Sequence, residues 1–347
     1  MPTPPVITTD QVIRQFKMDI YGKEVQSAAT YSYLWIAAQV GHIGVGIMGQ
    51  FLFYSISYYL LPHLNFSPDF ANLSGLALIT SAVAFWEWST YRSAIKRHTG
   101  SFKLNRNGLR NNALIATLYM WLGGLISFGF HLAPGYGLSM LIACLLIAFI
   151  PVSYWMRQKM IWQKASLPYL FRLADMKLDE QYAGKIQQLM DETDRPEEAP
   201  RQIIIEGTLG SGRTRLAVGI GSEFSFKKRK VRYLPFDKLV ELVNSNDSYR
   251  GPKNVDYWPW ADAEVLVIDD VAAIPLPHTE QSPVNEFDHF SQLLQEIIGH
   301  NPTCLKQRHT VWVLADIEEP SRWIDEIKSA CGNNGGSEPI IVSMPAV

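Results

Sequence analysis

The sequence predicts an α-helical membrane domain of four transmembrane helices, followed by an α/β domain with a parallel sheet. Three observations lead to this fold class. The chain has 347 residues and a net charge of −2, yet no charged side chain occurs between Val25 and Pro68, and long apolar stretches continue to about residue 157. The remainder is ordinary mixed sequence, in which apolar runs alternate with helix-compatible segments. Alternation of that kind is typical of a parallel sheet covered on both faces.

Four stretches are long and apolar enough to cross the hydrocarbon core of a bilayer. The expected spans cover residues 42–62, 70–91, 112–132 and 136–156, so that the transmembrane domain is residues 42–156. We expect residues 1–41 to form a cytoplasmic or interfacial segment with a helix that starts after Thr8. The third span contains Gly123, Gly124 and Ser127, whose small size favours close packing of a neighbouring helix.

The loop between the second and third expected spans is basic. From Arg92 to Arg110 it contains six lysines and arginines and no acid, whereas the connection from Pro62 to Asp69 carries one acid and no base. The positive-inside rule therefore predicts that this loop and both termini face the cytoplasm. The expected location is a bacterial inner membrane, in contact with membrane lipid.

Glu87 is the one acid within an expected span. An intramembrane carboxylate indicates ion or proton movement by default, but Trp86 and Trp88 beside it favour a place at the membrane interface. His63 and His131 lie near the outer ends of spans, where a metal or haem between them is a weaker alternative. The three cysteines form no C-x-x-C pair, so neither a disulfide framework nor a zinc site is indicated.

Residues 157–200 read as a juxtamembrane helix followed by an acidic, proline-bounded linker. Residues 201–347 are long enough for one independent core. In that domain we expect strands near Ile203 and at 231–235, 265–269, 310–315 and 339–343. The expected helices cover 213–226, 237–243, 285–298 and 320–330.

The first of these strands opens into a glycine-rich turn that is typical of a phosphate-binding loop. Glycines permit the backbone to turn successive N–H groups toward one anion, and a helix N-terminus adds positive potential. The spacing is that of G-x-x-x-x-G-K-[ST], except that Arg213 replaces the lysine. The residues expected to bind the nucleotide are Gly207, Thr208, Gly210, Ser211, Gly212, Arg213, Thr214 and Arg215.

The apolar run 265–268 ends in two carboxylates, Asp269 and Asp270, at the expected carboxyl edge of the sheet. Together with the loop, this motif predicts ATP and Mg²⁺ as ligands. We expect Thr214 and Asp269 to hold the metal ion and Asp270 to orient or deprotonate the attacking water.

The residues 207–217, 231–233, 237–240, 265–270 and 310–316 with Trp323 together resemble the AAA+ ATPases of the helicase-loader and transposition-helper group. The resemblance covers residues 201–323 and leaves the membrane half unassigned. It implies an ATP-binding fold in which Asp316 takes the place of a polar sensor residue with a catalytic role. Arg213, Asp316 and the expected absence of a helical lid before Val347 are departures from that group, and no arginine-finger motif is found, although Arg322 is nearby.

Two functions remain open. One is a membrane-anchored AAA+-like ATP-binding protein, with slow ATP hydrolysis, that regulates or assembles a partner complex at the cytoplasmic face of a membrane. The other is a degenerate phosphate-loop domain that acts as a docking subunit of a larger membrane assembly. Both imply other protein subunits, in a homo- or hetero-oligomer. Nucleic acid is not an expected partner, because the basic run 227–230 suits a solvated helix end.

Overall fold

The computed structural model describes residues 7–21, 31–60, 67–132, 134–192, 200–244, 260–271, 285–300, 305–314, 317, 319–332 and 338–345. The chain divides into two compact units. The membrane unit is residues 1–99 and 104–159, and the α/β unit is residues 100–103 and 160–347. Each is described by itself.

The membrane unit contains four helices long and apolar enough to cross a membrane, as the sequence predicts. They are α2 (Tyr31–Ser55, continued by the π-helical turn η2, Ile56–Leu60), α3 (Pro68–Arg97), α4 (Arg106–Leu132) and α5 (Pro134–Lys164). A shorter helix, α1 (Thr9–Tyr21), precedes them. The helix of the first span starts earlier than residue 42, because the uncharged sequence before it continues the same helix. The length and composition of these helices indicate an integral membrane protein.

Small residues and amides hold α2, α3 and α4 together. A Cβ at Gly123 would lie 2.1 Å from the carbonyl oxygen of Ile43, and one at Gly46 would lie 1.9 Å from that of Met120. The expected close approach of a helix to the third span is thus confirmed. Gln50, which is fully buried, donates to Asn72 at 2.6 Å and accepts from Ser127 at 2.5 Å. These bonds satisfy polar groups for which lipid offers no partner.

The α/β unit is built on a five-stranded sheet in the order β2-β3-β4-β1-β5, and every neighbouring pair is parallel. The strands are β1 (Gln202–Gly207), β2 (Val231–Pro235), β3 (Val265–Asp269), β4 (His309–Val313) and β5 (Ile340–Met344). The predicted parallel α/β domain is confirmed, and its architecture is consistent with a phosphate-loop fold. Successive strands of such a sheet need helical crossovers, which the intervening segments supply.

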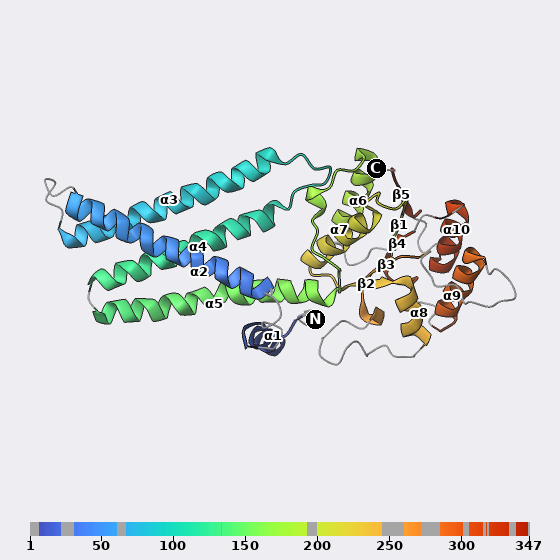
Figure 1. Ribbon diagram of the computed structural model, residues 1–347, viewed down its shortest axis with the longest axis horizontal. Helices are drawn as coiled ribbons and strands as arrows, with labels where there is room; N and C mark the ends of the chain where they lie inside the picture. The colour runs from blue at the N-terminus through green and yellow to red at the C-terminus, as the bar shows by residue number, and fades with distance from the viewer. Residues whose placement is uncertain are drawn as a thin grey trace. The chain divides into compact units, whose positions relative to one another are not determined.

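Alternate side chains of each strand serve the two faces of the sheet. Ile203, Ile205 and Val267 contribute to the core under α7 (Arg213–Phe226), whereas Ile204 and Trp312 contribute to the core on the other face. That second face is covered by α8 (Phe236–Asn244), α9 (Glu286–His300) and α10 (Pro320–Cys331). Figure 1 shows α7 on the opposite side of the strands from α9 and α10.

The core under α7 also contains chain from outside residues 201–347. Segment 160–192, with the single 3₁₀ turn Leu173–Asp175 and helix α6 (Glu180–Glu192), places buried side chains there, among them Leu173 and Ile186. Residues 165–176, which we call the strap, run beside α7. The amide of Tyr233 donates to the carbonyl of Ala165 at 2.8 Å, so the strap also caps the outer edge of β2.

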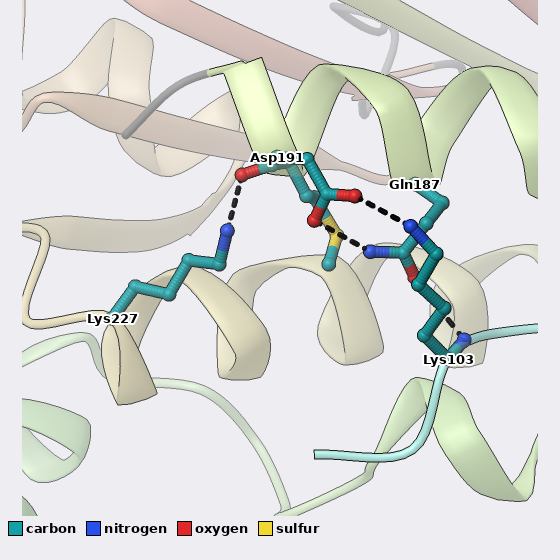
Figure 2. Close-up of polar contacts among 5 residues, drawn as sticks. Lys103, Gln187, Asp191 and Lys227 are labelled. Atoms are coloured by element: carbon teal, nitrogen blue, oxygen red, sulfur yellow. Dashed lines mark hydrogen bonds and ion pairs between the residues drawn. The ribbon is translucent and has the colours of Figure 1, made fainter. Parts of the chain in front are cut away.

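Residues Gly100–Lys103, which we call the clasp, come from the basic loop between α3 and α4 and belong to the α/β unit. The Phe102 side chain is 2% exposed within its core. The Ser101 hydroxyl donates to the Leu178 carbonyl at 2.6 Å and accepts from the Leu178 amide at 2.9 Å. Lys103 forms an ion pair of 2.9 Å with Asp191, whose other oxygen accepts from Gln187 (Figure 2).

Replacing Phe102 by alanine is expected to destabilise the protein by about 3–5 kcal/mol, because the buried ring leaves a cavity in the core. For a unit of this size that corresponds to a fall in melting temperature on the order of 10 °C, measurable on the full chain in detergent. Lys103→Ala is the control. Its ion pair is exposed, so the loss should be less than about 1 kcal/mol. Equal effects of the two substitutions would contradict the buried position of Phe102.

The environment of His309, at the start of β4, makes the stability of the fold depend on pH. Its Nδ1 accepts the Arg201 amide at 3.1 Å, which requires a neutral ring with Nδ1 unprotonated. Burial, with Arg229 and Arg201 nearby, lowers the pKa of His309 from 6.5 to about 4.

The folded state therefore binds fewer protons than the unfolded state between pH 6.5 and about 4, so stability should fall as the pH falls through that window. We expect a loss on the order of 2 kcal/mol. In His309→Asn, which keeps an acceptor but does not titrate, melting temperatures of the full chain at pH 7 and pH 4.5 should differ less than in the wild type. An undiminished difference would remove His309 as the cause.

Candidate nucleotide-binding site

The loop between β1 and α7 has the backbone of a phosphate cradle. Gly210 and Gly212 have φ angles of 85° and 88°, in the left-handed region that glycine adopts without strain. Gly207 is constrained by space, since a Cβ there would lie 2.7 Å from the Ser211 hydroxyl and 2.8 Å from the Met344 Cβ. The three glycines of the motif are thus each required by local geometry.

The loop leaves donors free for an anion. Its own bonds are from the Ser211 amide to the Thr208 carbonyl at 3.1 Å and from the Leu216 amide to the Gly212 carbonyl at 2.9 Å. Within the described chain, the amides of Gly210, Gly212 and Arg213 have no backbone acceptor. The buried Ser211 hydroxyl likewise has no partner there. These groups, at the N-terminus of α7, fit a phosphate.

Arg213 and Arg215 leave the start of α7 in different directions. One guanidinium nitrogen of Arg213 donates to the carbonyl of Gly207, so this side chain folds back across the loop. It is also close enough to Asp270 to favour the charged form of that carboxyl. The Arg215 guanidinium instead lies over the Phe171 ring of the strap, 4.5 Å from its centre.

Asp269 ends β3 and is 1% exposed. Its Oδ1 lies 3.4 Å from the Thr214 hydroxyl and accepts the Asp270 amide at 2.8 Å, while its Oδ2 accepts the Tyr233 hydroxyl at 2.6 Å. The sheet brings these residues together, because the carboxyl ends of parallel strands share one edge. The two residues expected to hold Mg²⁺ are therefore adjacent, and their oxygen donors suit a hard cation.

Asp270 lies at the surface of the α/β unit, directly after β3, with a φ of 55°. Partial burial of its carboxyl and the neighbouring Asp269 raise its pKa, and Arg213 opposes the shift. The backbone of a residue other than glycine is strained in the left-handed region, although aspartate and asparagine tolerate this conformation better than most residues. The position thus combines backbone strain with like-charge repulsion.

Two tyrosines belong to the site and were not anticipated from the motifs. Burial and the bond to Asp269 raise the pKa of Tyr233 well above its usual range, which keeps it a donor. Burial raises the pKa of Tyr169, in the strap, and Asp269 adds to the shift while Arg215 opposes it. Tyr233 could have been found from strand order, since β2 is the neighbour of β3. No sequence signal places the strap beside the site.

Asp316, the expected sensor residue, lies outside the described residues. Among the residues described, no group of three or more histidine, cysteine or acidic side chains could hold a metal ion by itself. His63 also lies outside them, and His131 donates to the Ser127 carbonyl at 2.8 Å and packs against Tyr54.

No protein-family model matches this chain, and no curated protein matches it either. The resemblance to helicase-loader and transposition-helper ATPases therefore remains a prediction from motifs. The findings support a parallel α/β domain consistent with a phosphate-loop fold.

Asp270→Asn is expected to stabilise the protein slightly, by about 0.5 kcal/mol or less, because solvent screens the repulsion that is removed. Since the folded pKa is raised, the repulsion is present above the ordinary carboxyl pKa and disappears below it. Melting temperatures should show the gain at pH 7 and lose it near pH 3.5. Asp288→Asn, which removes an exposed ion pair with Arg322, is the control and should give no gain. A destabilised Asp270→Asn at pH 7 would contradict the repulsion.

Proposed function

We propose that the protein is a membrane-anchored, AAA+-like ATP-binding protein that regulates or assembles a partner complex at the cytoplasmic face of a membrane, with slow ATP hydrolysis. The observation that carries the proposal is the convergence at one sheet edge of a glycine loop with free amides, the Thr214–Asp269 pair and Asp270. A structural turn would need no buried carboxylate facing the start of the next helix.

The chain's own residues suggest how the site works. The free amides of the loop bind and orient the phosphates, and the Thr214 hydroxyl and Asp269 would hold Mg²⁺, which supplies charge neutralisation when bound. The raised pKa of Asp270 suits a group that accepts a proton from water near neutral pH. Tyr233 occupies one oxygen of Asp269 and fixes its orientation.

Slow turnover follows from Arg213. Lysine presents a compact ammonium, whereas the arginine fork needs more room and already donates to Gly207. The guanidinium must leave that carbonyl before it can reach a phosphate. Binding tolerates such a rearrangement better than catalysis does, because catalysis requires a fixed arrangement of charges.

The clasp supports a topology in which the basic loop and the α/β unit lie on the same side of the membrane. Phe102 shares a core with Ile203 and Leu216, so residues 100–103 and the sheet must lie on the same side of any membrane. Two candidate spans, α4 and α5, separate them in sequence, which satisfies that requirement. With the positive-inside rule, this side is the cytoplasm, where ATP is available, and a bacterial inner membrane fits the arrangement.

Contacts along α7 support a regulatory role. Arg172 of the strap forms a two-bond ion pair with Glu223 of α7, at 2.7 and 3.1 Å, and its guanidinium lies over Phe226. A Cβ at Gly219 would lie 2.6 Å from the Leu173 side chain. A shift of α7 on nucleotide binding would therefore be felt by the strap, which is continuous with α5. We propose that other protein subunits, in a homo- or hetero-oligomer, bind the protein and respond to that shift.

The bond from Arg213 to Gly207 also favours the second candidate, a docking subunit with a degenerate loop. In that case the guanidinium permanently fills the place of a phosphate. Nucleic acid is not proposed as a partner of either, because Lys227 donates to the Met190 carbonyl (Figure 2) and Arg229 pairs with Glu264 at 2.9 Å.

Nucleotide binding to the full chain in lipid nanodiscs separates the two candidates. Arg213→Ala is expected to weaken Mg·ATP binding at least tenfold, or about 1.4 kcal/mol, measured by equilibrium dialysis. Arg213→Lys should retain binding and raise turnover if side-chain geometry alone limits the rate. Lys238→Ala, which removes a cation from the exposed face of α8, should bind as the wild type does.

If Mg·ATP binds to wild type and Arg213→Ala with the same dissociation constant, Arg213 does not meet a phosphate. If neither binds at millimolar concentration, the docking function replaces the ATP-binding one.

A further inference from the structure

The membrane unit has a partly open cavity of about 420 Å³, with a mixed polar and apolar lining, near the ends of α3 and α4 that flank the basic loop. Its volume lies within the roughly 300–1,000 Å³ of small-molecule sites. All four long helices contribute to its wall. The polar and aromatic lining residues are Trp35, Gln39, His42, Glu87, Thr90, Tyr91, Asn112 and Trp155.

Glu87 gives the cavity its charge. It is partly buried, while its neighbours Trp86 and Trp88 are 69% and 53% exposed and so point away from the bundle. Those two tryptophans are the ones that suit the membrane interface, whereas Glu87 faces inward. Asp69 is the only other acid between Val25 and Lys164, and it lies at the opposite end of α3.

The Glu87 carboxylate lacks a counter-ion in the described chain. No hydrogen bond or ion pair reaches it there, and no lysine or arginine is among the residues that line the cavity. His42 interacts with it electrostatically, but the Nδ1 of that ring is engaged with Gln39 at 3.2 Å. A carboxylate among membrane helices without a partner is energetically unfavourable, so a bound cation would be favoured.

The walls select the kind of cation. Trp35 and Trp155, which both line the cavity, stack with ring centres 4.9 Å apart, and Tyr119, outside the lining, supports Trp35 edge-on at 6.0 Å. Aromatic faces attract ammonium groups and also pack against apolar substituents. Glu87 is the only carboxylate in the lining, and the described residues contain no group of three or more histidine, cysteine or acidic side chains of the kind that holds a metal ion.

We propose that this cavity binds an organic cation, an ammonium or phosphonium group carrying aromatic or alkyl substituents. Glu87 is its counter-ion, and Trp35 and Trp155 are its aromatic walls. The buried amide of Gln39, which is 8% exposed, and the amide of Asn112 supply hydrogen-bond partners for a polar substituent. This site gives the membrane unit a ligand of its own, independent of nucleotide binding in the α/β unit.

The test uses two ions of the same shape and opposite charge, tetraphenylphosphonium and tetraphenylborate. Each is titrated into the full chain in a non-ionic detergent, with intrinsic tryptophan fluorescence and calorimetry as readouts and protein-free micelles as the blank. We expect saturable binding of the phosphonium alone. Glu87→Gln should weaken it at least tenfold, about 1.4 kcal/mol, because the counter-ion is lost.

Asp69→Asn is the matched control, since it removes the other carboxylate of the same helix and should leave binding unchanged. Glu87→Asp keeps the charge and should retain measurable binding. Equal binding of the two ions to the wild type would overturn the proposal, and that comparison needs no variant. Undiminished phosphonium binding to Glu87→Gln would overturn it as well.

Soluble amines and lipid headgroups share this chemistry. Competition of the bound phosphonium by dihexanoyl-phosphatidylcholine but not by benzyltrimethylammonium would assign the site to a lipid, and the reverse would assign it to a soluble cation. Either pattern supports an organic-cation site, and failure of both competitors would contradict it.

Discussion

Burial of one face of the sheet is the constraint on which the α/β unit depends. Helix α7 begins at the glycine loop and covers one face of β1, β3 and β4. It does not cover that face alone, because other chain segments share the same core. Phe102, Leu173 and Ile186 complete that core from the clasp, the strap and α6. Each buried side chain of this size contributes about 1.5–3 kcal/mol. Helix α7 is thus stabilised by residues of the α/β unit that precede β1, the first strand of the sheet, in sequence.

The elements of residues 201–347 could be predicted because their signals are local. The run 265–269 is continuously apolar until its carboxylates, and the glycines before Arg213 mark the start of α7, so the expected bounds of β2, β3 and α7 are those observed. The packing of the strap and clasp has no such signal. Phe102 lies in a polar, basic loop, and only the three-dimensional core explains why it is buried.

The arrangement of the candidate site could be predicted from the sequence only where it depends on strand ends and loop spacing. Strand ends and loop spacing bring Thr214 and Asp269 together, because parallel strands end at one edge. The direction of a long side chain is decided by its neighbours instead. Arg213 turns back to the Gly207 carbonyl and Arg215 turns to Phe171, although both follow the same glycine. For the same reason, sequence placed Glu87 within a belt of tryptophans and only helix packing orients it toward a cavity.

The clasp also bears on how the protein is made. Residues 100–103 leave the ribosome well before residues 203–344, which supply the sheet that buries Phe102. Until β1, β3 and α7 have been synthesised, this aromatic side chain has no native core to enter, and α4 and α5 must be inserted in the meantime. A chain whose α4 or α5 failed to insert would hold Phe102 and its core on opposite sides of the bilayer. Completion of the α/β unit therefore requires that α4 and α5 leave Phe102 and the sheet on the same side, and a chain with only one of the two helices inserted would expose apolar surface that chaperones and proteases recognise.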